Sequence, residues 1–351
     1  MKYFESDPDS VYEAKVRAQQ ISFAPVVFQA SRLLRKYNVL SKVYEAGKVG
    51  IALADLQTQV SLPAYGVKVL AEAGLGIGLL FLRDDRFCLT KAGHILLNDR
   101  MTRVNIDFVH DVCYRGLFDL EKSILEGRPA GLSTLGEWPT VYEGLSSLPK
   151  DIQESWFAFD HFYSDDAFPK ALPLVFAQEP KRLLDIGGNT GKWALKCVGY
   201  DPHVRVTIVD LPAQIAMMKA NATSDRIDGY GMNILDPAQA FPKGYDAIWM
   251  SQFLDCFSPE EIVGILRRAA AVMDERARLY ILETYWDRQA NATAAFCLQQ
   301  TSLYFTCIAN GNSQMYHSRD MKNCLDQAGL TVVRETDSVG FYHTLTECRL
   351  G

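Results

Sequence analysis

The sequence predicts an α/β fold, in which a doubly wound and mostly parallel β-sheet follows a smaller helical module. Short β-branched runs alternate with helical patterns from residue 181 onward, as is typical of such a sheet. Before residue 100, apolar residues instead recur every three or four positions, which indicates helices. The 351 residues, 48% of them hydrophobic, suffice for two domains with cores of their own. We expect three segments: residues 1–100, 101–178 and 179–351.

The first segment predicts an all-helical module that carries a small β wing. Helical spacing runs through residues 21–98, and Gly74 is expected to end a short helix over residues 65–73. Residues 79–82 and 87–90 read as two strands joined by a charged turn. Helices followed by such a wing are typical of a winged-helix module.

The composition disfavours nucleic acid and membrane partners. The formal net charge is −6, whereas proteins that bind DNA or RNA need a basic surface to displace counterions from phosphates. The helix that would read DNA carries Lys68 as its only cation, opposed by Glu72. No apolar run approaches the roughly 18 residues of a membrane span. We expect a cytoplasmic protein whose partner is a small molecule.

The middle segment is helical and rich in aromatic residues. Such a density is typical of a core, and a helical layer of this kind can also cover a flat substrate. The residues are Phe108, Tyr114, Phe118, Trp138, Tyr142, Trp156, Phe157, Phe159, Phe162 and Tyr163.

The third segment supplies the strands and helices of the predicted sheet. The last two strands lie too close together for a helical crossover, so they should pair as an antiparallel hairpin at the sheet edge. Strands are expected at residues 182–186, 205–209, 245–250, 278–283, 331–336 and 341–349, and helices at residues 191–200, 213–222, 259–273 and 318–328.

A glycine-rich turn follows the first of these strands, with the sequence D-I-G-G-N-T-G at residues 185–191. Glycines let the backbone bend sharply and approach a ligand, and the turn falls at the edge of the sheet where such folds bind ligands. Asp210 closes the next strand about 20 residues later, the distance at which an acid reaches ribose hydroxyls.

Asp185 distinguishes between two classes of cofactor that such a turn can bind. A pyrophosphate favours bare backbone donors at the start of a helix and is repelled by a neighbouring anion. S-adenosylmethionine (SAM) has no phosphate and carries an ammonium and a sulfonium, so Asp185 favours it over a dinucleotide. The sequence therefore predicts SAM as the cofactor and no metal.

With this turn and the residues that follow it, the chain resembles the class I SAM-dependent O-methyltransferases of the caffeic acid and hydroxyindole type. The resemblance covers nearly the whole chain, including V-D-L-P at residues 209–212 and the stretch 246–265. It implies a Rossmann-like methyltransferase sheet, a winged-helix dimerisation domain and a homodimer formed through that domain. It also implies S-adenosylhomocysteine as a product.

The resemblance assigns further cofactor contacts, with several departures from the family pattern. Asn189 stands where a third glycine is usual, and asparagine also tolerates left-handed backbone. Asn233 replaces the acid of an Asp-Met adenine pair, and Ser251 replaces a lysine near the adenine. The expected cofactor residues are Asp185, Gly187, Gly188, Gly191, Asp210, Leu211, Met232, Asn233, Ser251, Gln252, Phe162 and Tyr163.

The catalytic position departs further, because Asp255 stands where the family has its general-base histidine. An aspartate with an ordinary pKa of about 3.9 is a weak base for a phenol unless burial raises that pKa. Three interpretations remain open. Asp255 is the base in an apolar pocket beside Phe253 and Phe257; the acceptor is an acidic phenol or carboxylate that ionises unaided; or catalysis has been lost.

Two more residues complete the predicted catalytic set. Glu283 falls where an acid orients the base in the family, and His317 is a substitute base three residues after Gln314, which replaces a second acid. The resemblance implies methyl transfer to a hydroxyl or carboxyl oxygen of a small aromatic or conjugated acceptor. The alternatives are a SAM-binding regulatory protein that does not methylate, or a relative with hydroxylase or decarboxylase chemistry.

Overall fold

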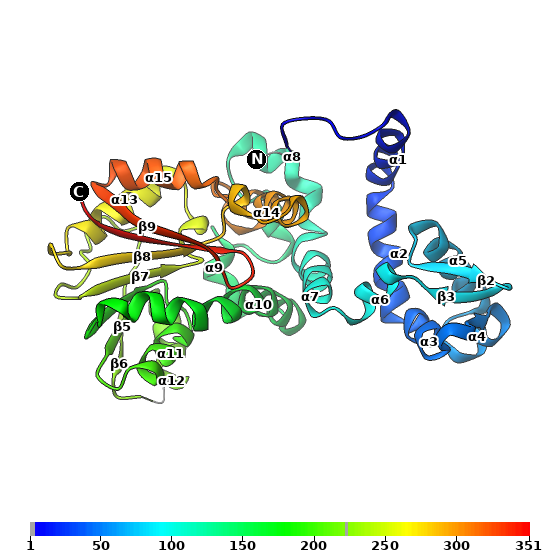
Figure 1. Cartoon of the computed structure of the whole chain (residues 1–351), viewed down its shortest axis with the longest axis horizontal. Coiled ribbons are helices and arrows are strands. Elements are labelled where there is room, and N and C mark those ends of the chain that lie inside the picture. The colour runs from blue at the N-terminus through cyan, green and yellow to red at the C-terminus, as the bar shows by residue number, and fades with distance from the viewer. Residues whose placement is uncertain (1–3, 222–223) are drawn as a thin grey trace. The chain divides into compact units, whose positions relative to one another are not determined.

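The computed structural model describes residues 4–221 and 224–351, so residues 1–3 and Ala222, the last residue of one predicted helix, lie outside it (Figure 1). The chain divides into two compact units, Met1–Val109 and His110–Gly351. Within the described residues, no helix has both the length and the apolar character needed to cross a bilayer.

The first unit packs helices around a three-stranded antiparallel sheet in the order β1-β3-β2. The predicted wing is confirmed as β2 (Leu80–Arg83) and β3 (Arg86–Leu89), and β1 (Ile51–Ala52) adds a third strand. A core centred on Leu34, Leu40 and Leu56 joins them. The helices are α1 (Val11–Ser22), α2 (Ala24–Lys36), α3 (Val39–Glu45), α4 (Leu53–Gln59), α5 (Ala64–Ile77), α6 (Lys91–Asn98) and α7 (Arg100–Phe108).

Helix α5 is longer than the sequence pattern predicts. Gly74 does not end it; the helix continues to Ile77 and ends at Gly78, whose φ of 83° is left-handed. A Cβ on Gly74 would lie 2.9 Å from the Leu80 side chain. Gly74 is therefore explained by close packing of the helix on β2 rather than by a helix end.

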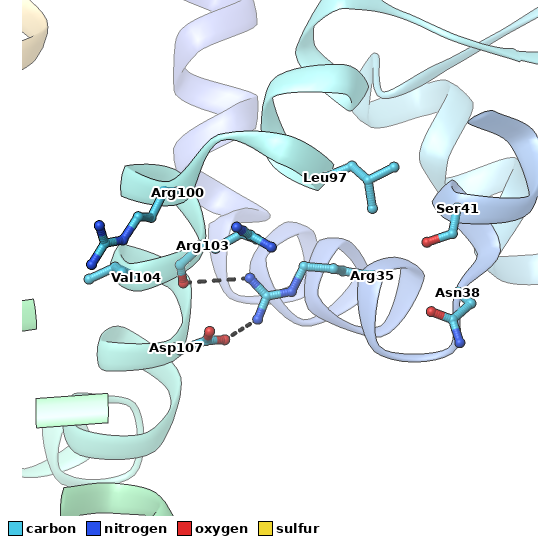
Figure 2. Close-up of a pocket in the computed structure, with 8 residues that line it drawn as sticks. All are labelled: Arg35, Asn38, Ser41, Leu97, Arg100, Arg103, Val104 and Asp107. Carbon is cyan, nitrogen blue, oxygen red and sulfur yellow. Dashed lines mark hydrogen bonds and ion pairs between the residues drawn. The ribbon is translucent and has the colours of Figure 1, made fainter. Parts of the chain in front are cut away.

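The first unit also carries an open pocket of about 410 Å³, which Figure 2 shows. Arg35 crosses it, forming an ion pair with Asp107 and donating to the carbonyl oxygen of Arg103 at 3.5 Å. The lining residues are Arg35, Asn38, Ser41, Leu97, Arg100, Arg103, Val104 and Asp107.

The second unit contains a seven-stranded sheet in the order β6-β5-β4-β7-β8-β10-β9. The strands from β6 to β8 pair in parallel, and β10 runs antiparallel to both β8 and β9. The predicted terminal hairpin is thus confirmed, with its last strand inserted inside the sheet. The strands are β4 (Arg182–Ile186), β5 (Arg205–Asp210), β6 (Ile227–Gly231), β7 (Ala247–Ser251), β8 (Arg278–Glu283), β9 (Leu330–Val339) and β10 (His343–Leu350).

Strand β6 was absent from the strands expected from β-branched runs. Its residues Ile227–Gly231 include two glycines and an aspartate, which are depleted in strands. It forms because β5 offers an open edge with which it pairs in register from Val206 to Asp210.

Helices cover both faces of this sheet (Figure 1). Apolar residues of α13 and α15 fill one core, and those of α10, α11 and α12 fill the other. The helices of this unit are α8 (Leu120–Glu126), α9 (Val141–Gly144), α10 (Lys150–Val175), α11 (Lys192–Tyr200), α12 (Pro212–Asn221), α13 (Pro259–Ala270), α14 (Ala292–Tyr304) and α15 (Ser318–Gln327). The carboxyl ends of the parallel strands therefore meet at one edge, where a ligand site is expected.

Candidate active site

The glycine turn between β4 and α11 presents bare backbone at this edge. Gly187 has a φ of 77°, and a Cβ there would lie 2.2 Å from the Phe253 ring. A Cβ on Gly188 would lie 2.6 Å from Oδ2 of Asp185. Asn189 has a φ of 49°, so the left-handed backbone expected at this departure from the family is confirmed. Gly191, with a φ of 81°, then caps α11.

Asp185 lies beneath this turn with an unsatisfied carboxylate. The residue is 2% exposed, and its Oδ2 atom has no hydrogen-bond partner among the described residues. Burial raises its pKa well above the ordinary value, and the nearby Asp210 carboxylate raises it further. A buried acid without a partner suits a cationic ligand group, which would lower the cost of ionising it.

Asp210, the last residue of β5, is held by backbone donors. Its Oδ2 atom accepts from the Asn189 N–H at 2.8 Å, and its Oδ1 atom accepts from the Leu211 N–H at 2.7 Å. Burial raises the pKa of Asp210, and these two hydrogen bonds oppose that rise. Each carboxylate oxygen can accept a second hydrogen bond, so Asp210 still has capacity for ligand hydroxyls.

The residues after β6 and β7 extend the same edge. Met232 is buried and donates its N–H to the carbonyl of Asp210 at 2.9 Å, whereas Asn233 is exposed and forms a local turn to Leu235. Ser251 Oγ and Gln252 Oε1 are buried and have no hydrogen-bond partner within residues 4–221 and 224–351. A polar cofactor bound beside the glycine turn would supply the hydrogen bonds that these buried atoms lack.

Phe162 and Tyr163 on α10 lie beside the β9–β10 hairpin. Phe162 stacks on Phe341 with ring centroids 6.4 Å apart, and Tyr163 contacts Tyr342 at 5.9 Å. Helix α10 also reaches the start of α11, because Asp165 pairs with Lys192 at 3.3 Å.

Asp255 lies in a short turn, Leu254–Cys256, after β7. It is 6% exposed, and the Phe253 and Phe257 rings beside it contact each other at 4.8 Å. Burial, and to a smaller extent the negative charge of Asp160, raises the pKa of Asp255 to about 7. The carboxyl therefore titrates in the range that suits a general base.

Glu283, at the end of β8, holds this turn through its backbone. Its Oε1 atom accepts from the N–H groups of Phe253 at 2.9 Å and Leu254 at 2.8 Å. The residue is 1% exposed, and its Oε2 atom has no hydrogen-bond partner in the part of the chain that is described. Burial and the Asp255 carboxyl raise the pKa of Glu283, so the two acids disfavour each other's ionisation.

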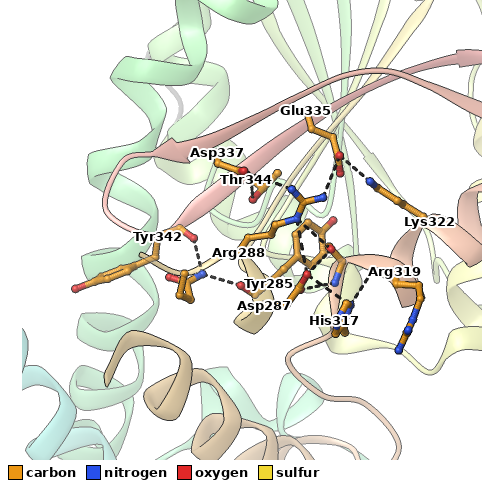
Figure 3. Close-up of polar contacts among 12 residues, drawn as sticks. Tyr285, Asp287, Arg288, His317, Arg319, Lys322, Glu335, Asp337, Tyr342 and Thr344 are labelled. Atoms are coloured by element: carbon orange, nitrogen blue, oxygen red, sulfur yellow. Dashed lines mark hydrogen bonds and ion pairs between the residues drawn. The ribbon is translucent and has the colours of Figure 1, made fainter. Parts of the chain in front are cut away.

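His317 belongs to a different set of contacts, which Figure 3 shows. It caps α15 by accepting from the Arg319 N–H at 3.0 Å and lies 3.5 Å from the Asp287 carboxylate. Arg288 continues the network to Glu335 at 3.2 Å. The hydrogen bonds and ion pair described for His317 hold the helix start and do not join it to Asp255.

Asp160 on α10 was not among the residues predicted for the site, and its charge acts on Asp255. Burial raises its pKa to about 6, although its side chain keeps 30% of its exposure. Trp156, four residues earlier, donates its indole N–H to the hydroxyl of Tyr304 at 2.8 Å. An acid inside an otherwise aromatic run was the available signal, in a segment whose aromatic density is typical of a core or of a layer that covers a substrate.

Two family models match the chain. A dimerisation2-like domain matches residues 15–87, and a methyltransferase domain matches residues 159–335. The second match covers half of the chain and includes both the glycine turn and Asp255.

Individual proteins agree with these matches. The chain is 22% identical to an L-tyrosine C(3)-methyltransferase of Streptomyces lavendulae, over 80% of this chain and 78% of that protein. It is 27% identical to a norreticuline-7-O-methyltransferase of Papaver somniferum, over 60% and 56%. Its fold is similar to that of human N-acetylserotonin methyltransferase solved in complex with SAM, with a TM-score of 0.69, 16% identity and 99% coverage of both chains.

Proposed function

The chain belongs to the methyltransferase domain family, in the O-methyltransferase branch with an N-terminal dimerisation module, and on that premise we propose that it methylates an oxygen of a small aromatic or conjugated acceptor, using SAM. The observation that carries this proposal is the cradle at residues 185–191, where bare backbone covers a buried acid that lacks a partner.

The cradle fits the chemistry of SAM. Asp185 would hold the positively charged methionine end, and Asp210 would hold the ribose hydroxyls with its remaining acceptor capacity. Ser251 and Gln252 would supply polar contacts to the adenine side. When bound, SAM supplies an electrophilic methyl group and leaves as S-adenosylhomocysteine.

Asp255 is the proposed base. Its carboxylate would accept the proton of the acceptor hydroxyl and so free the oxygen that receives the methyl group supplied by SAM. A pKa of about 7 leaves enough carboxylate at neutral pH while keeping useful basicity. Glu283 is a positioning residue, because it holds the backbone that carries Asp255. His317, which caps the start of α15, is the alternative base.

A second candidate is methyl transfer to a ring carbon. It is favoured by one of the relatives that match 80% of this chain, which is named an L-tyrosine C(3)-methyltransferase. Removal of a phenol proton by Asp255 serves both outcomes, since a phenolate has nucleophilic character at its ortho carbon as well as its oxygen. In the second outcome the methylated ring carbon would then lose its own proton to solvent, which restores the aromatic ring, and the phenolate would take back a proton. No feature of the described residues favours the regulatory, hydroxylase or decarboxylase alternatives.

The first unit supports a homodimer. Helix α1 has no buried residue, and Val11 is 90% and Ile21 is 68% exposed. Phe23 and Val26 extend this apolar surface at 60% and 64% exposure. Helices that leave apolar side chains exposed in this way are typical of a surface that a second copy covers.

Calorimetry and product analysis together test the proposal. SAM should bind the wild-type protein. Asp210→Ala should weaken SAM affinity by more than it lowers turnover at saturating SAM. Incubation with methyl-labelled SAM and a panel of phenols and aromatic acids should then give a labelled product, whose NMR spectrum distinguishes an O-methyl from a C-methyl group. Binding of a nicotinamide or flavin nucleotide in place of SAM would refute the proposal.

A further inference from the structure

The pocket of the first unit gathers positive charge on a chain that is negative overall. Three of its eight lining residues are arginines, and Asp107 is the only acid among those eight. The formal net charge of the whole chain is −6. All eight residues belong to the unit Met1–Val109, so one compact part of the chain forms the pocket. A concave surface with this excess of guanidinium groups attracts anions.

Two helices bring the arginines together. Arg100, Arg103 and Asp107 follow one another on α7 at spacings of three and four, so they share a face of that helix. Arg35 lies in the last turn of α2, and Asn38, with a left-handed φ of 61°, leads the chain into α3. Figure 2 shows the side chains of Arg35 and Arg103 extending toward each other from α2 and α7.

The charge of these two facing arginines is only partly compensated. Arg35 forms its ion pair with Asp107 and donates to the Arg103 carbonyl oxygen at 3.5 Å, and its side chain is 20% exposed. Among the described residues, no acid forms an ion pair with Arg103. Each guanidinium carries five N–H donors, so the two groups keep donors for a further anion.

The other lining residues indicate which anion fits. Asn38 and Ser41 offer neutral polar groups, whereas Leu97 and Val104 offer apolar surface. The volume of about 410 Å³ lies within the range of small-molecule sites. A phosphate has enough oxygens to accept from guanidinium groups on two sides, and an attached organic group would lie against the apolar residues. The lining therefore fits a small phosphate monoester.

A nucleic acid backbone offers the same phosphate chemistry but fits the location less well. The helix that would read DNA is α5, where Lys68 pairs with Glu72 at 3.9 Å. Neither α5 nor the wing strands β2 and β3 contribute a residue to the pocket. The pocket also includes two aliphatic side chains, which a phosphate backbone does not need. These features favour a small molecule.

We propose that this pocket binds a small phosphate monoester, whose phosphate lies between Arg35 and Arg103 and whose organic group contacts Leu97 and Val104. None of these residues is assigned to SAM or to the acceptor, so the inference does not depend on the proposed function. The bound phosphate competes with Asp107 for the Arg35 guanidinium. Loss of that acid should therefore strengthen binding, whereas loss of an arginine should weaken it.

The test uses calorimetry on the full chain at pH 8 and constant ionic strength, with three probes of similar size. Phenyl phosphate is doubly charged at this pH, because the second pKa of a phosphate monoester is about 6. Benzenesulfonate is singly charged and benzamide is neutral. Phenyl phosphate should bind one site per chain, roughly tenfold more tightly than benzenesulfonate, and benzamide should bind most weakly.

Two variants of opposite sign locate the site. Arg103→Gln should weaken phenyl phosphate binding roughly tenfold, because it removes charge-assisted hydrogen bonds. Asp107→Asn should strengthen binding about threefold, because it releases Arg35 from its ion pair. Arg83→Gln is the matched control, since it removes an exposed arginine of the same unit from outside the pocket and should leave the affinity unchanged.

Several results would overturn the inference. These are no binding of phenyl phosphate to the wild-type protein, equal binding of the charged and neutral probes, and an unchanged affinity in folded Arg103→Gln. Equal losses in Arg103→Gln and Arg83→Gln, or weaker binding in Asp107→Asn, would do the same. A DNA duplex that displaces phenyl phosphate would assign the site to nucleic acid instead. The order of the three probes on the wild-type protein decides the matter even if a variant does not fold.

Discussion

The edge of the sheet has a cofactor half, around Asp185 and Asp210, and an acceptor half, around Asp255 and Glu283. Each half contains two acids that differ in their hydrogen bonding. In the cofactor half, Asp210 is tied to two backbone N–H groups, while Asp185 keeps an oxygen without a partner. In the acceptor half, Glu283 is tied to two backbone N–H groups and Asp255 is left for chemistry. In each pair one acid accepts from two backbone N–H groups of a turn, and the other is the one that we propose to contact the charged end of SAM or the reacting group of the acceptor.

The two halves differ in how the backbone contributes. Left-handed residues concentrate around the cofactor half, at Gly187, Asn189, Gly191 and Gln252, whereas the turn of Asp255 has none. Strained backbone that persists in a fold is held there by its surroundings. We therefore expect substitutions in the cofactor half to change SAM affinity, and those in the acceptor half to change turnover and its proton balance.

The largest effect is expected for Asp255→Asn. The amide cannot accept the acceptor's proton at neutral pH, so kcat should fall by about 10³-fold. SAM affinity measured by calorimetry should stay within twofold of wild type, since Asp255 lies outside the cradle. Equal kcat values in the two proteins would remove Asp255 as the base.

The same variant should gain stability at high pH. Burial raises the pKa of Asp255 from 3.8 to about 7, so the folded state holds this proton more tightly than the unfolded state. That contribution is complete below pH 3.8 and is lost as the pH rises through about 7. Asp255→Asn should therefore raise the free energy of unfolding by about 4 kcal/mol at pH 8. Urea titration should show this gain disappear near pH 4; a gain independent of pH would contradict the assignment.

Gly188→Ala tests the cofactor half alone. The added Cβ would lie 2.6 Å from Oδ2 of Asp185, so the turn or the acid must move. The cost of such overpacking is about 2 kcal/mol, which should appear as roughly 30-fold weaker SAM binding. Gly199→Ala is the control, because a Cβ there meets nothing within 4 Å. Equal losses of SAM affinity in both variants would mean that the close approach of Gly188 to Asp185 does not determine SAM binding.

The smallest effect is expected for His317→Gln. The contacts of His317 are with Asp287, Trp286 and the Arg319 N–H, so the substitution should affect the start of α15 more than the chemistry. Steady-state assays should give a kcat within threefold of wild type. A loss comparable to that of Asp255→Asn would make His317 the base.

The sequence predicted the sheet and the cofactor turn well because both are encoded locally. Hydrophobic runs indicate strands, and an acid followed by glycines indicates a turn. Strand β6 escaped because its Ile-Asp-Gly-Tyr-Gly sequence forms a strand only through its partner β5. The extent of α5 was wrong because Gly74 serves packing, which a spacing pattern does not register.

The acceptor half was harder to predict for a physical reason. Glu283 is expected to orient the base, and its hydrogen bonds reach backbone N–H groups of Phe253 and Leu254, which no residue pattern encodes. Asp160 comes from α10, about a hundred positions from Asp255, and only the fold brings them together. The division into residues 1–100, 101–178 and 179–351, the individual site residues and the cytoplasmic location stay predictions.

The placement of β10 has a consequence for biosynthesis. This strand lies between β8 and β9, and Thr344 pairs with Glu283. Residues 343–350 are synthesised after the other strands of this sheet. A nascent chain therefore holds Glu283 at an open edge of the sheet until residues 343–350 leave the ribosome. Prematurely stopped chains therefore keep that edge unpaired, exposed to proteases and to pairing with other chains.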